Sequence, residues 1–334
     1  MQTDTELLFN RLKELPLFIS DLIITRAGER SIKTRIAYVN DYKAFLVYII
    51  ENSYSKATEP KDVTTSELSL LSTLDLDTFL TKYMETHSKS STSRMKASLS
   101  VLFKYLTNVT KDLSINNFEG TQKIMVPKKD YVVYLTTEEQ ETLIKTITTP
   151  TLSSLTPLQL KRHHETALRD LALIYLFLDT GLRLSEVQQI DIKDVDLEYS
   201  NVTVIRKGGN PKQVYFSDQA NTYITQYLNH RQQSLQLALL SSPTDPLFIN
   251  IHGERLTTRG IEKIIKKWVQ AALPLRTDIS VHKLRSSFAM SFYEATNDIL
   301  ALQERMNHKS LNTTNIYAKA YHNISKETRN WHTT

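Results

Sequence analysis

A break in helical periodicity between Gly120 and Leu135 divides the chain. On both sides of it, apolar residues recur every three or four positions, which is the spacing of amphipathic helices. The stretch TQKIMVPKKDYVVYL lacks this period and contains a proline and two adjacent lysines. Because 334 residues are enough for about two domains with separate cores, we predict a helical domain over residues 1–125, a linker over 126–135 and a second domain over 136–334.

Composition narrows the class of protein. The 7 glycines and 9 prolines leave little material for long loops and favour helix. The 41 Lys and Arg residues exceed the 36 Asp and Glu residues by only +5, which favours a polyanionic partner if the basic residues gather on one face. No cysteine is present, which excludes disulfides, a thiol nucleophile and a thiolate metal site.

The sequence shows no targeting segment. The N-terminus lacks a basic region followed by an apolar one, so it is not a secretory signal. The longest apolar run, residues 171–178, is shorter than the roughly 18 residues that span a bilayer. Residues 162–165 hold two histidines and a glutamate but not the HExxH spacing, and we interpret them as the polar start of a helix. We therefore predict a cytoplasmic protein with no bound metal.

The first domain is predicted to be helical throughout. Residues 7–24 form an opening helical segment that Pro16 kinks or interrupts. Ser31 caps a long amphipathic helix, and a short helix covers residues 74–84. A second long helix follows, with Met95, Leu99, Leu102 and Leu106 on its apolar face.

Basic residues decorate this last helix. Lysine and arginine side chains and helix N-termini contact DNA phosphates. An ordinary solvated face explains the same residues equally well when the helix is considered alone. The candidate DNA contacts here are Lys89, Arg94 and Lys96.

The second domain mixes helices with a small antiparallel sheet. Thr136 followed by Glu139 is a capping-box pattern at its first helix. The apolar run before Gly181 predicts a buried helix that ends at this glycine. A hairpin is predicted from strands over residues 201–205 and 213–216, joined by the turn KGGNP.

Two more helices follow the hairpin. One covers residues 221–240, and the other opens at Thr258 with isoleucines and Trp268 facing inward. The outer face of the second helix carries three lysines, which are either phosphate contacts or a solvated face. These candidates are Lys263, Lys266 and Lys267.

Five side chains in the second domain suit one reaction. Two guanidinium groups can grip a phosphodiester through paired donors and never lose their charge. Imidazoles can donate hydrogen bonds and move protons near neutral pH, and a phenol can attack phosphorus. Four of the five lie in SVHKLRSSFAMSFYEATNDILALQERMNHKSLNTTNIYAK, and one lies upstream in TGLRLSEV. The set is Arg183, His282, Arg285, His308 and Tyr317.

The motifs GLRxSE, HxxR, a second histidine and a tyrosine nine residues later closely resemble the tyrosine site-specific recombinases. The segments IRKGGNPKQV and VHKLR look most like the Xer group, and within it the single-recombinase branch. The resemblance covers about half of the chain. It implies a mainly helical, two-domain architecture with a small antiparallel sheet, in which a core-binding domain and a catalytic domain form a C-shaped clamp on DNA.

The resemblance also implies roles for the site residues. Tyr317 is the nucleophile, and it forms a covalent 3′-phosphotyrosyl intermediate without metal or ATP. Lys207 matches the hairpin lysine that protonates the leaving oxygen, and Lys212 is a weaker candidate for that role and for DNA contact. Glu186, three residues after Arg183, is expected to orient that arginine.

Two departures from the family pattern lie beside the catalytic positions. Arg285 is followed by Ser286 and Ser287, where a histidine and a threonine or serine are common. Met306 and Asn307 replace the usual Leu-Gly before the second histidine. Neither change alters a catalytic group, so they bear on the branch and on local packing.

The partners follow from the resemblance. We expect a double-stranded DNA recombination site, two protomers on each site, a tetramer in the synapse, nucleoid association and activation by an FtsK-type DNA translocase. The tail from residue 321 to 334, with Ile324 and Trp331 as apolar anchors, docks either on a neighbouring protomer or on its own domain. The alternatives are an integrase of a mobile element, a type IB topoisomerase and a helical DNA-binding regulator. The lack of room for an arm-binding domain before Ser31 disfavours the larger phage integrases.

Overall fold

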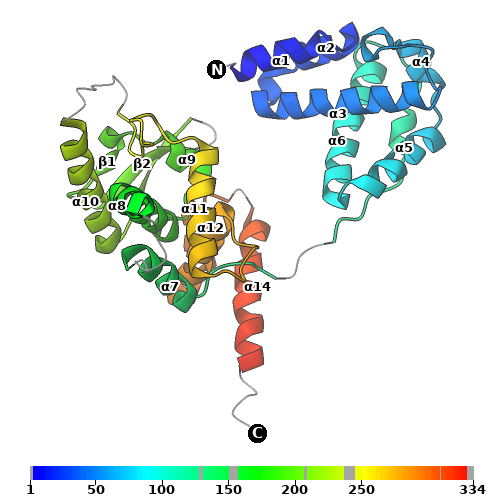
Figure 1. The fold of residues 1–334 in the computed structure, drawn as a ribbon. Helices are drawn as coiled ribbons and strands as arrows, with labels where there is room; N and C mark the ends of the chain where they lie inside the picture. The colour runs from blue at the N-terminus through cyan, green and yellow to red at the C-terminus, as the bar shows by residue number, and fades with distance from the viewer. Residues whose placement is uncertain are drawn as a thin grey trace. The chain divides into compact units, whose positions relative to one another are not determined.

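The computed structural model describes residues 3–127, 131–149, 157–206, 209–236, 245–308 and 310–328. The chain forms two compact units, Met1–Lys128 and Lys129–Thr334. Each unit is described by itself. The described residues are mainly helical with one three-stranded antiparallel sheet, which confirms the predicted fold class (Figure 1). No helix among them is both long and apolar enough to cross a membrane.

Unit 1 is built from helices packed around one apolar core. Pro16 separates the first two helices and precedes the second, as its fixed backbone angle allows. Ser31 caps the long third helix by accepting the N–H of Thr34, as predicted. The helices are α1 (Asp4–Leu12), α2 (Leu17–Thr25), α3 (Ile32–Glu51), α4 (Thr65–Leu70), α5 (Thr73–Thr86) and α6 (Lys89–Asn108).

Aromatic rings and one buried hydroxyl hold the core of unit 1 together. Phe45 of α3 meets Phe79 of α5 edge to face, with ring centroids 5.1 Å apart. Phe103 of α6 also meets Phe45 edge to face, with ring centroids 6.2 Å apart. The buried Tyr42 hydroxyl donates to the carbonyl of Ser98 at 3.1 Å, so α3 and α6 share a satisfied polar contact.

Unit 2 carries the sheet and the remaining helices. Thr136 caps its first helix in a capping box with Glu139, as predicted. The elements are α7 (Thr137–Thr148), α8 (Pro157–Thr180), α9 (Leu184–Gln189), β1 (Val195–Asp196), β2 (Asn201–Ile205), β3 (Pro211–Tyr215), α10 (Asp218–Gln236), α11 (Thr258–Ala272), α12 (Val281–Thr296), α13 (Ile299–Met306) and α14 (Leu311–Thr328).

Several bounds differ from those predicted. Strand β3 begins two residues earlier than expected, because its first residues pair with β2 up to the partners Ile205 and Pro211. Helix α10 begins before residue 221, and residues 237–240 lie outside the described part of the chain. The helix that bears Tyr317 runs from Leu311 to Thr328, since no glycine or proline follows Leu311 to end it.

Helix α8 is the central support of unit 2. Its residues 171–177 are buried apart from Tyr175, and α10 and α12 pack against it (Figure 1). The sheet runs in the order β1-β2-β3, with Val202 opposite Val214 on the face that joins the same core. This packing fixes the points where α8 ends, α9 and α12 begin and the hairpin starts.

Candidate active site

Arg183 lies where the chain turns from α8 into α9. Gly181 makes the turn with φ +58°, a conformation that favours glycine, and Arg183 then occupies the N-cap position of α9. Its Nη1 donates to Glu186 Oε1 at 2.9 Å, and its backbone N–H donates to Glu186 Oε2 at 2.8 Å. The carboxylate is buried while the arginine side chain is 40% exposed, so Glu186 holds a guanidinium that still faces solvent.

Arg285 lies almost completely buried near the start of α12. It is 3% exposed, and its two terminal nitrogens donate to the backbone carbonyls of Gly181 and Met306. Burial, followed by the charge of Arg183, lowers the pKa of Arg285 to about 10. The group therefore remains a cation at neutral pH, fixed between two backbone segments.

The two histidines are neutral at physiological pH. Burial and the nearby cations Lys283, Arg285 and Arg183 lower the pKa of His282. Burial, then Arg285 and Arg183, lower the pKa of His308 to about 4.

A hydroxyl fixes the orientation of the second imidazole. His308 Nδ1 is hydrogen-bonded to the buried Thr314 Oγ1 at 2.9 Å, so Nε2 is the ring nitrogen left to exchange a proton with another group.

Tyr317 lies on α14 and is 5% exposed. Burial raises the pKa of its phenol, while a hydrogen bond from Ser286 and the charge of Arg285 act in the opposite direction. The nucleophile expected from the sequence is thus beside the second arginine, in its protonated form.

The five predicted groups lie in the same part of unit 2, where the charges of the arginines affect the pKa values of the other three. Arg183 and Arg285 act on both histidines, and Arg285 acts on Tyr317. A cavity of about 800 Å³ opens beside Arg183, His282 and Arg285. Arg183, His282 and Arg285 line this space, while His308 and Tyr317 lie near enough to feel the charge of Arg285. Such a set of cations, neutral imidazoles and a phenol can bind a phosphodiester and exchange protons with it.

Family comparison agrees with this geometry. Residues 133–323 match the model of the phage integrase family. The chain belongs to the phage integrase family. It is a tyrosine recombinase most like the Xer group, and so an enzyme of the class that cleaves and rejoins DNA.

Relatives of known name support the same class. This integrase-family chain is 28% identical to tyrosine recombinase XerS of Lactococcus lactis subsp. cremoris, over 90% of its own length and 89% of the relative. It is 35% identical to tyrosine recombinase XerC of Vibrio cholerae, over 54% and 55% of the two chains.

A solved structure supports the fold. The XerH recombinase bound to difH substrate before cleavage matches with a TM-score of 0.65 and 22% identity, covering 91% of this chain and 92% of that one.

The hairpin residues of this integrase-family member are only partly described. Lys207 lies outside the described residues. Lys212 Nζ lies 3.0 Å from Glu304 Oε1 of α13, so it is engaged in an ion pair within unit 2. The side chains of Ile324 and Trp331 in the tail also lie outside the description.

The candidate DNA-contact residues differ in their surroundings. Lys266 lines the cavity beside the arginines, and Lys263 is exposed on the same helix. Lys267 Nζ lies 3.6 Å from the buried Asp170 and 3.9 Å from the ring centroid of Trp268. Lys267 is therefore engaged within unit 2, whereas Lys263 and Lys266 remain the candidates of this helix for a phosphate contact.

The candidates on α6 differ in the same way. Lys89 is exposed at the first position of the helix. Arg94 forms an ion pair with the buried Asp41, and Lys96 Nζ donates to the carbonyl of Thr121 at 2.8 Å. Lys89 is thus the candidate best placed for a phosphate near this helix start.

Three polar residues in the site were not predicted as site residues from the sequence. Ser286 contacts the phenol, Thr314 contacts the second imidazole, and Arg206 is a buried arginine at the end of β2. Arg206 directly precedes Lys207, so the hairpin motif contained the signal. Ser286 and Thr314 gave none, because hydroxyl residues are common on any helix.

The two departures from the family pattern have structural reasons. Asn307 adopts φ +49° at the end of α13, and asparagine tolerates this left-handed conformation better than most residues other than glycine. Ser287 Oγ accepts the N–H of Leu135 at 2.7 Å, so it ties α12 to the segment that enters unit 2.

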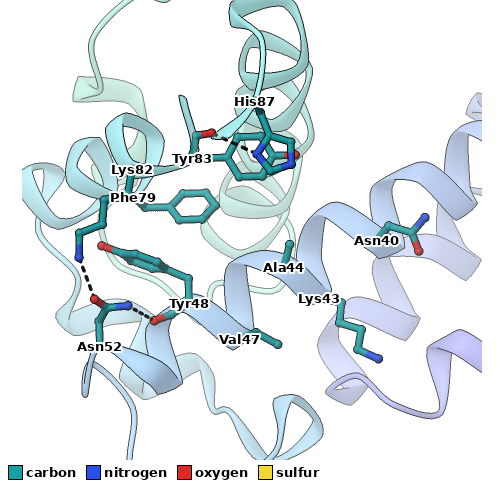
Figure 2. Close-up of a pocket in the computed structure, with 10 residues that line it drawn as sticks. All are labelled: Asn40, Lys43, Ala44, Val47, Tyr48, Asn52, Phe79, Lys82, Tyr83 and His87. Carbon is teal, nitrogen blue, oxygen red and sulfur yellow. Dashed lines mark hydrogen bonds between the residues drawn. The ribbon is translucent and has the colours of Figure 1, made fainter. Parts of the chain in front are cut away.

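Unit 1 has a separate hollow between α3 and α5 (Figure 2). Its volume is about 650 Å³, and aromatic rings including Tyr48, Phe79 and Tyr83 line it. Lys82 Nζ donates to Asn52 Oδ1 at 2.9 Å and lies 5.4 Å from the centroid of Tyr48. These lysine and asparagine groups satisfy each other, and the hollow holds no counterpart of the paired arginines.

Proposed function

We propose that this chain is a site-specific recombinase that cleaves DNA through a covalent bond between Tyr317 and a 3′-phosphate. The observation that supports this most strongly is the convergence of Arg183, Arg285, two histidines and the phenol in one part of unit 2. Packing alone explains a buried tyrosine but not its convergence with two arginines and two histidines.

Cleavage is an exchange at one phosphorus. Arg183 and Arg285 hold the non-bridging oxygens and stabilise the charge that develops in the transition state. The phenolic oxygen of Tyr317 bonds to phosphorus, and the bond from phosphorus to the 5′-oxygen breaks. The phenol proton passes to His308 Nε2, and Lys207 gives a proton to the leaving 5′-oxygen. His282 donates a hydrogen bond to the phosphate.

Phosphate binding prepares the base that deprotonates Tyr317. Bringing an ordinary phenol from a pKa near 10 to neutrality requires about 4 kcal/mol. The pKa of Tyr317 is raised further by burial, so the free protein holds the phenol protonated. The negative charge of a bound phosphate offsets the positive charges of the two guanidinium groups. It therefore raises the pKa of His308 from about 4, and the imidazole becomes a stronger base.

The phosphotyrosyl ester conserves the energy of the broken bond. A 5′-hydroxyl can attack it and reverse the reaction, so rejoining consumes no ATP. When the attacking hydroxyl comes from a second DNA site, the strands are exchanged.

We further propose the setting of the reaction. The two units grip one duplex as a C-shaped clamp, two protomers bind each site, and two sites form a tetrameric synapse. The chain is similar to the tyrosine recombinases XerS and XerC. On its resemblance to the Xer group, we propose a role in resolving chromosome or plasmid dimers on the nucleoid in the cytoplasm, with an FtsK-type translocase as activator.

A nicked suicide substrate tests the central proposal. Genomic DNA is first incubated with the protein, and the covalently trapped fragments are mapped to find the site. A nick beside the cleavage point then lets a short strand diffuse away, so the intermediate accumulates and is counted on a denaturing gel. Tyr317→Phe should abolish it. Tyr293→Phe, which alters another buried tyrosine of the same apolar cluster, should retain it.

The arginines are tested with the same substrate. Arg183→Ala and Arg285→Ala should keep DNA binding and lose at least about 100-fold in cleavage, as loss of a preorganised donor does. Full cleavage by either variant would refute its assigned role. Relaxation of supercoiled DNA without a partner site would indicate a topoisomerase instead.

A further inference from the structure

Three guanidinium groups meet the C-terminal end of α13. Arg206 Nη2 donates to the carbonyl of Arg305 at 3.1 Å, Arg285 donates to the carbonyl of Met306, and Arg183 Nη2 lies 3.5 Å from the carbonyl of Asn307. The last carbonyls of a helix lack partners within the helix and carry partial negative charge. The end of α13 is therefore a common anchor for the two proposed catalytic arginines and for Arg206.

Arg206 has an unusual environment for a cation. It is 6% exposed, and its Nε and Nη1 atoms are buried without a hydrogen-bond partner in the structure. Burial lowers the pKa of its guanidinium, against the opposing effect of Glu186. A buried charge with unmet donors costs stability, so its contribution to folding does not account for it.

The backbone of Arg206 closes the turn between β2 and β3. Its N–H donates to the carbonyl of Asn210 at 3.3 Å, and its carbonyl accepts the N–H of Gly209 at 2.9 Å. The side chain of the same residue reaches α13. One residue thus joins the turn of the hairpin to the helix end that holds Arg285.

Two further contacts join the hairpin to α13. Lys212 Nζ lies 3.0 Å from Glu304 Oε1, and Arg305 Nη1 donates to the carbonyl of Tyr215 at 3.3 Å. Both are at the surface, where solvent weakens an ion pair or a hydrogen bond. The bond from the buried Arg206 side chain to the carbonyl of Arg305 is partly shielded, so solvent weakens it less than the two surface contacts.

We propose that Arg206 is a positioning residue that ties the β2–β3 hairpin to the C-terminal end of α13 and thereby aligns the leaving-group side of the cleavage site. This inference rests on the proposed function, because Lys207, the acid assigned there, follows Arg206 in the chain. Arg206 acts on the protonation of the 5′-oxygen and not on the grip on the phosphate.

A change of leaving atom tests this. In a suicide substrate whose bridging 5′-oxygen is replaced by sulfur, the thiolate leaves without a proton, so an error in the acid no longer matters. Arg206→Gln should cleave the oxygen substrate about tenfold or more slowly than the wild type, since small misplacements of a catalytic group are costly. With the sulfur substrate its rate should return to within about threefold of the wild type.

Four further variants serve as controls for the Arg206→Gln result. Lys207→Ala should show the same rescue by sulfur, and Arg285→Ala should be slow with both substrates. Arg206→Lys keeps a charge and one donor toward Arg305, so its loss should be smaller and it guards against a folding defect in the glutamine variant. Arg231→Gln removes another buried guanidinium of unit 2 and should leave the ratio of the two rates unchanged.

The outcomes are distinct. Equal slowing of Arg206→Gln on both substrates, or no slowing on either, overturns the inference while the proposed function stands. A wild-type chain that traps no covalent complex overturns the proposed function and this inference with it. Lys207→Ala without rescue by sulfur refutes the acid assignment and, with it, the role given to Arg206.

Discussion

Replacing Glu186 by glutamine should slow cleavage without weakening DNA binding. The carboxylate accepts two bonds from Arg183, one from Nη1 at 2.9 Å and one from the backbone N–H at 2.8 Å. A glutamine keeps the shape but has one acceptor oxygen, and its NH₂ group would face a donor. Glu186→Gln therefore loses either the guanidinium bond or the cap of α9.

The size of the effect follows from these bonds. A hydrogen bond to a charged group contributes about 1.5–3 kcal/mol, and the lower end applies because the Arg183 side chain is 40% exposed. About 1.5 kcal/mol corresponds to roughly a tenfold slower step. Removing a buried carboxylate beside Arg183 and Arg206 also makes the site more positive, so affinity for the phosphate should not fall.

Single-turnover cleavage of the suicide substrate at saturating DNA measures the rate, and a mobility shift at fixed salt measures the affinity. Glu254→Gln removes an exposed carboxylate elsewhere in unit 2 and should leave both unchanged. Wild-type cleavage by Glu186→Gln, or a parallel loss of affinity and rate, would contradict the orienting role of the carboxylate.

Three other predictions concern stability and salt. Gly181→Ala should lower the free energy of unfolding by about 2–4 kcal/mol in urea titrations, because φ is +58° and the new Cβ would lie 2.3 Å from Phe288. The pKa of His308 is lowered to about 4, so between pH 6.5 and 4 the unfolded chain takes up a proton that the folded chain does not. The contribution of this group to the free energy of unfolding should be complete above about pH 6.5 and should decrease as the pH falls from 6.5 to 4. His308→Gln should remove this part of the decrease in pH-dependent unfolding titrations. Lys266→Ala should reduce the slope of log affinity against log salt by about 1 in binding titrations, whereas an unchanged slope would exclude a phosphate contact.

Local sequence signals predicted several helix and strand ends of unit 2 correctly. The cap at Thr136, the stop at Gly181 and the bounds of β2 depend on side-chain chemistry within a few residues. Glu186 was predicted beside Arg183 for the same reason, since three positions along a helix start bring two side chains together.

Long-range contacts were not predictable in this way. The bond from Arg206 to the carbonyl of Arg305 joins residues 99 positions apart, and Lys96 reaches the carbonyl of Thr121, 25 positions away. A sequence shows that such a residue is basic but not which backbone carbonyl will lie beside it. The burial of Tyr317 also depends on how α14 packs against α12.

The burial of Tyr317 also bears on unwanted DNA cleavage. On the proposed function, a molecule that is not bound at its site keeps the pKa of this phenol raised by burial, and so offers almost no phenoxide to other phosphodiesters. The attack of Tyr317 on other phosphodiesters is thereby suppressed. On the proposed function, strand cleavage therefore depends on a bound phosphate and a base that together turn the buried phenol into a nucleophile.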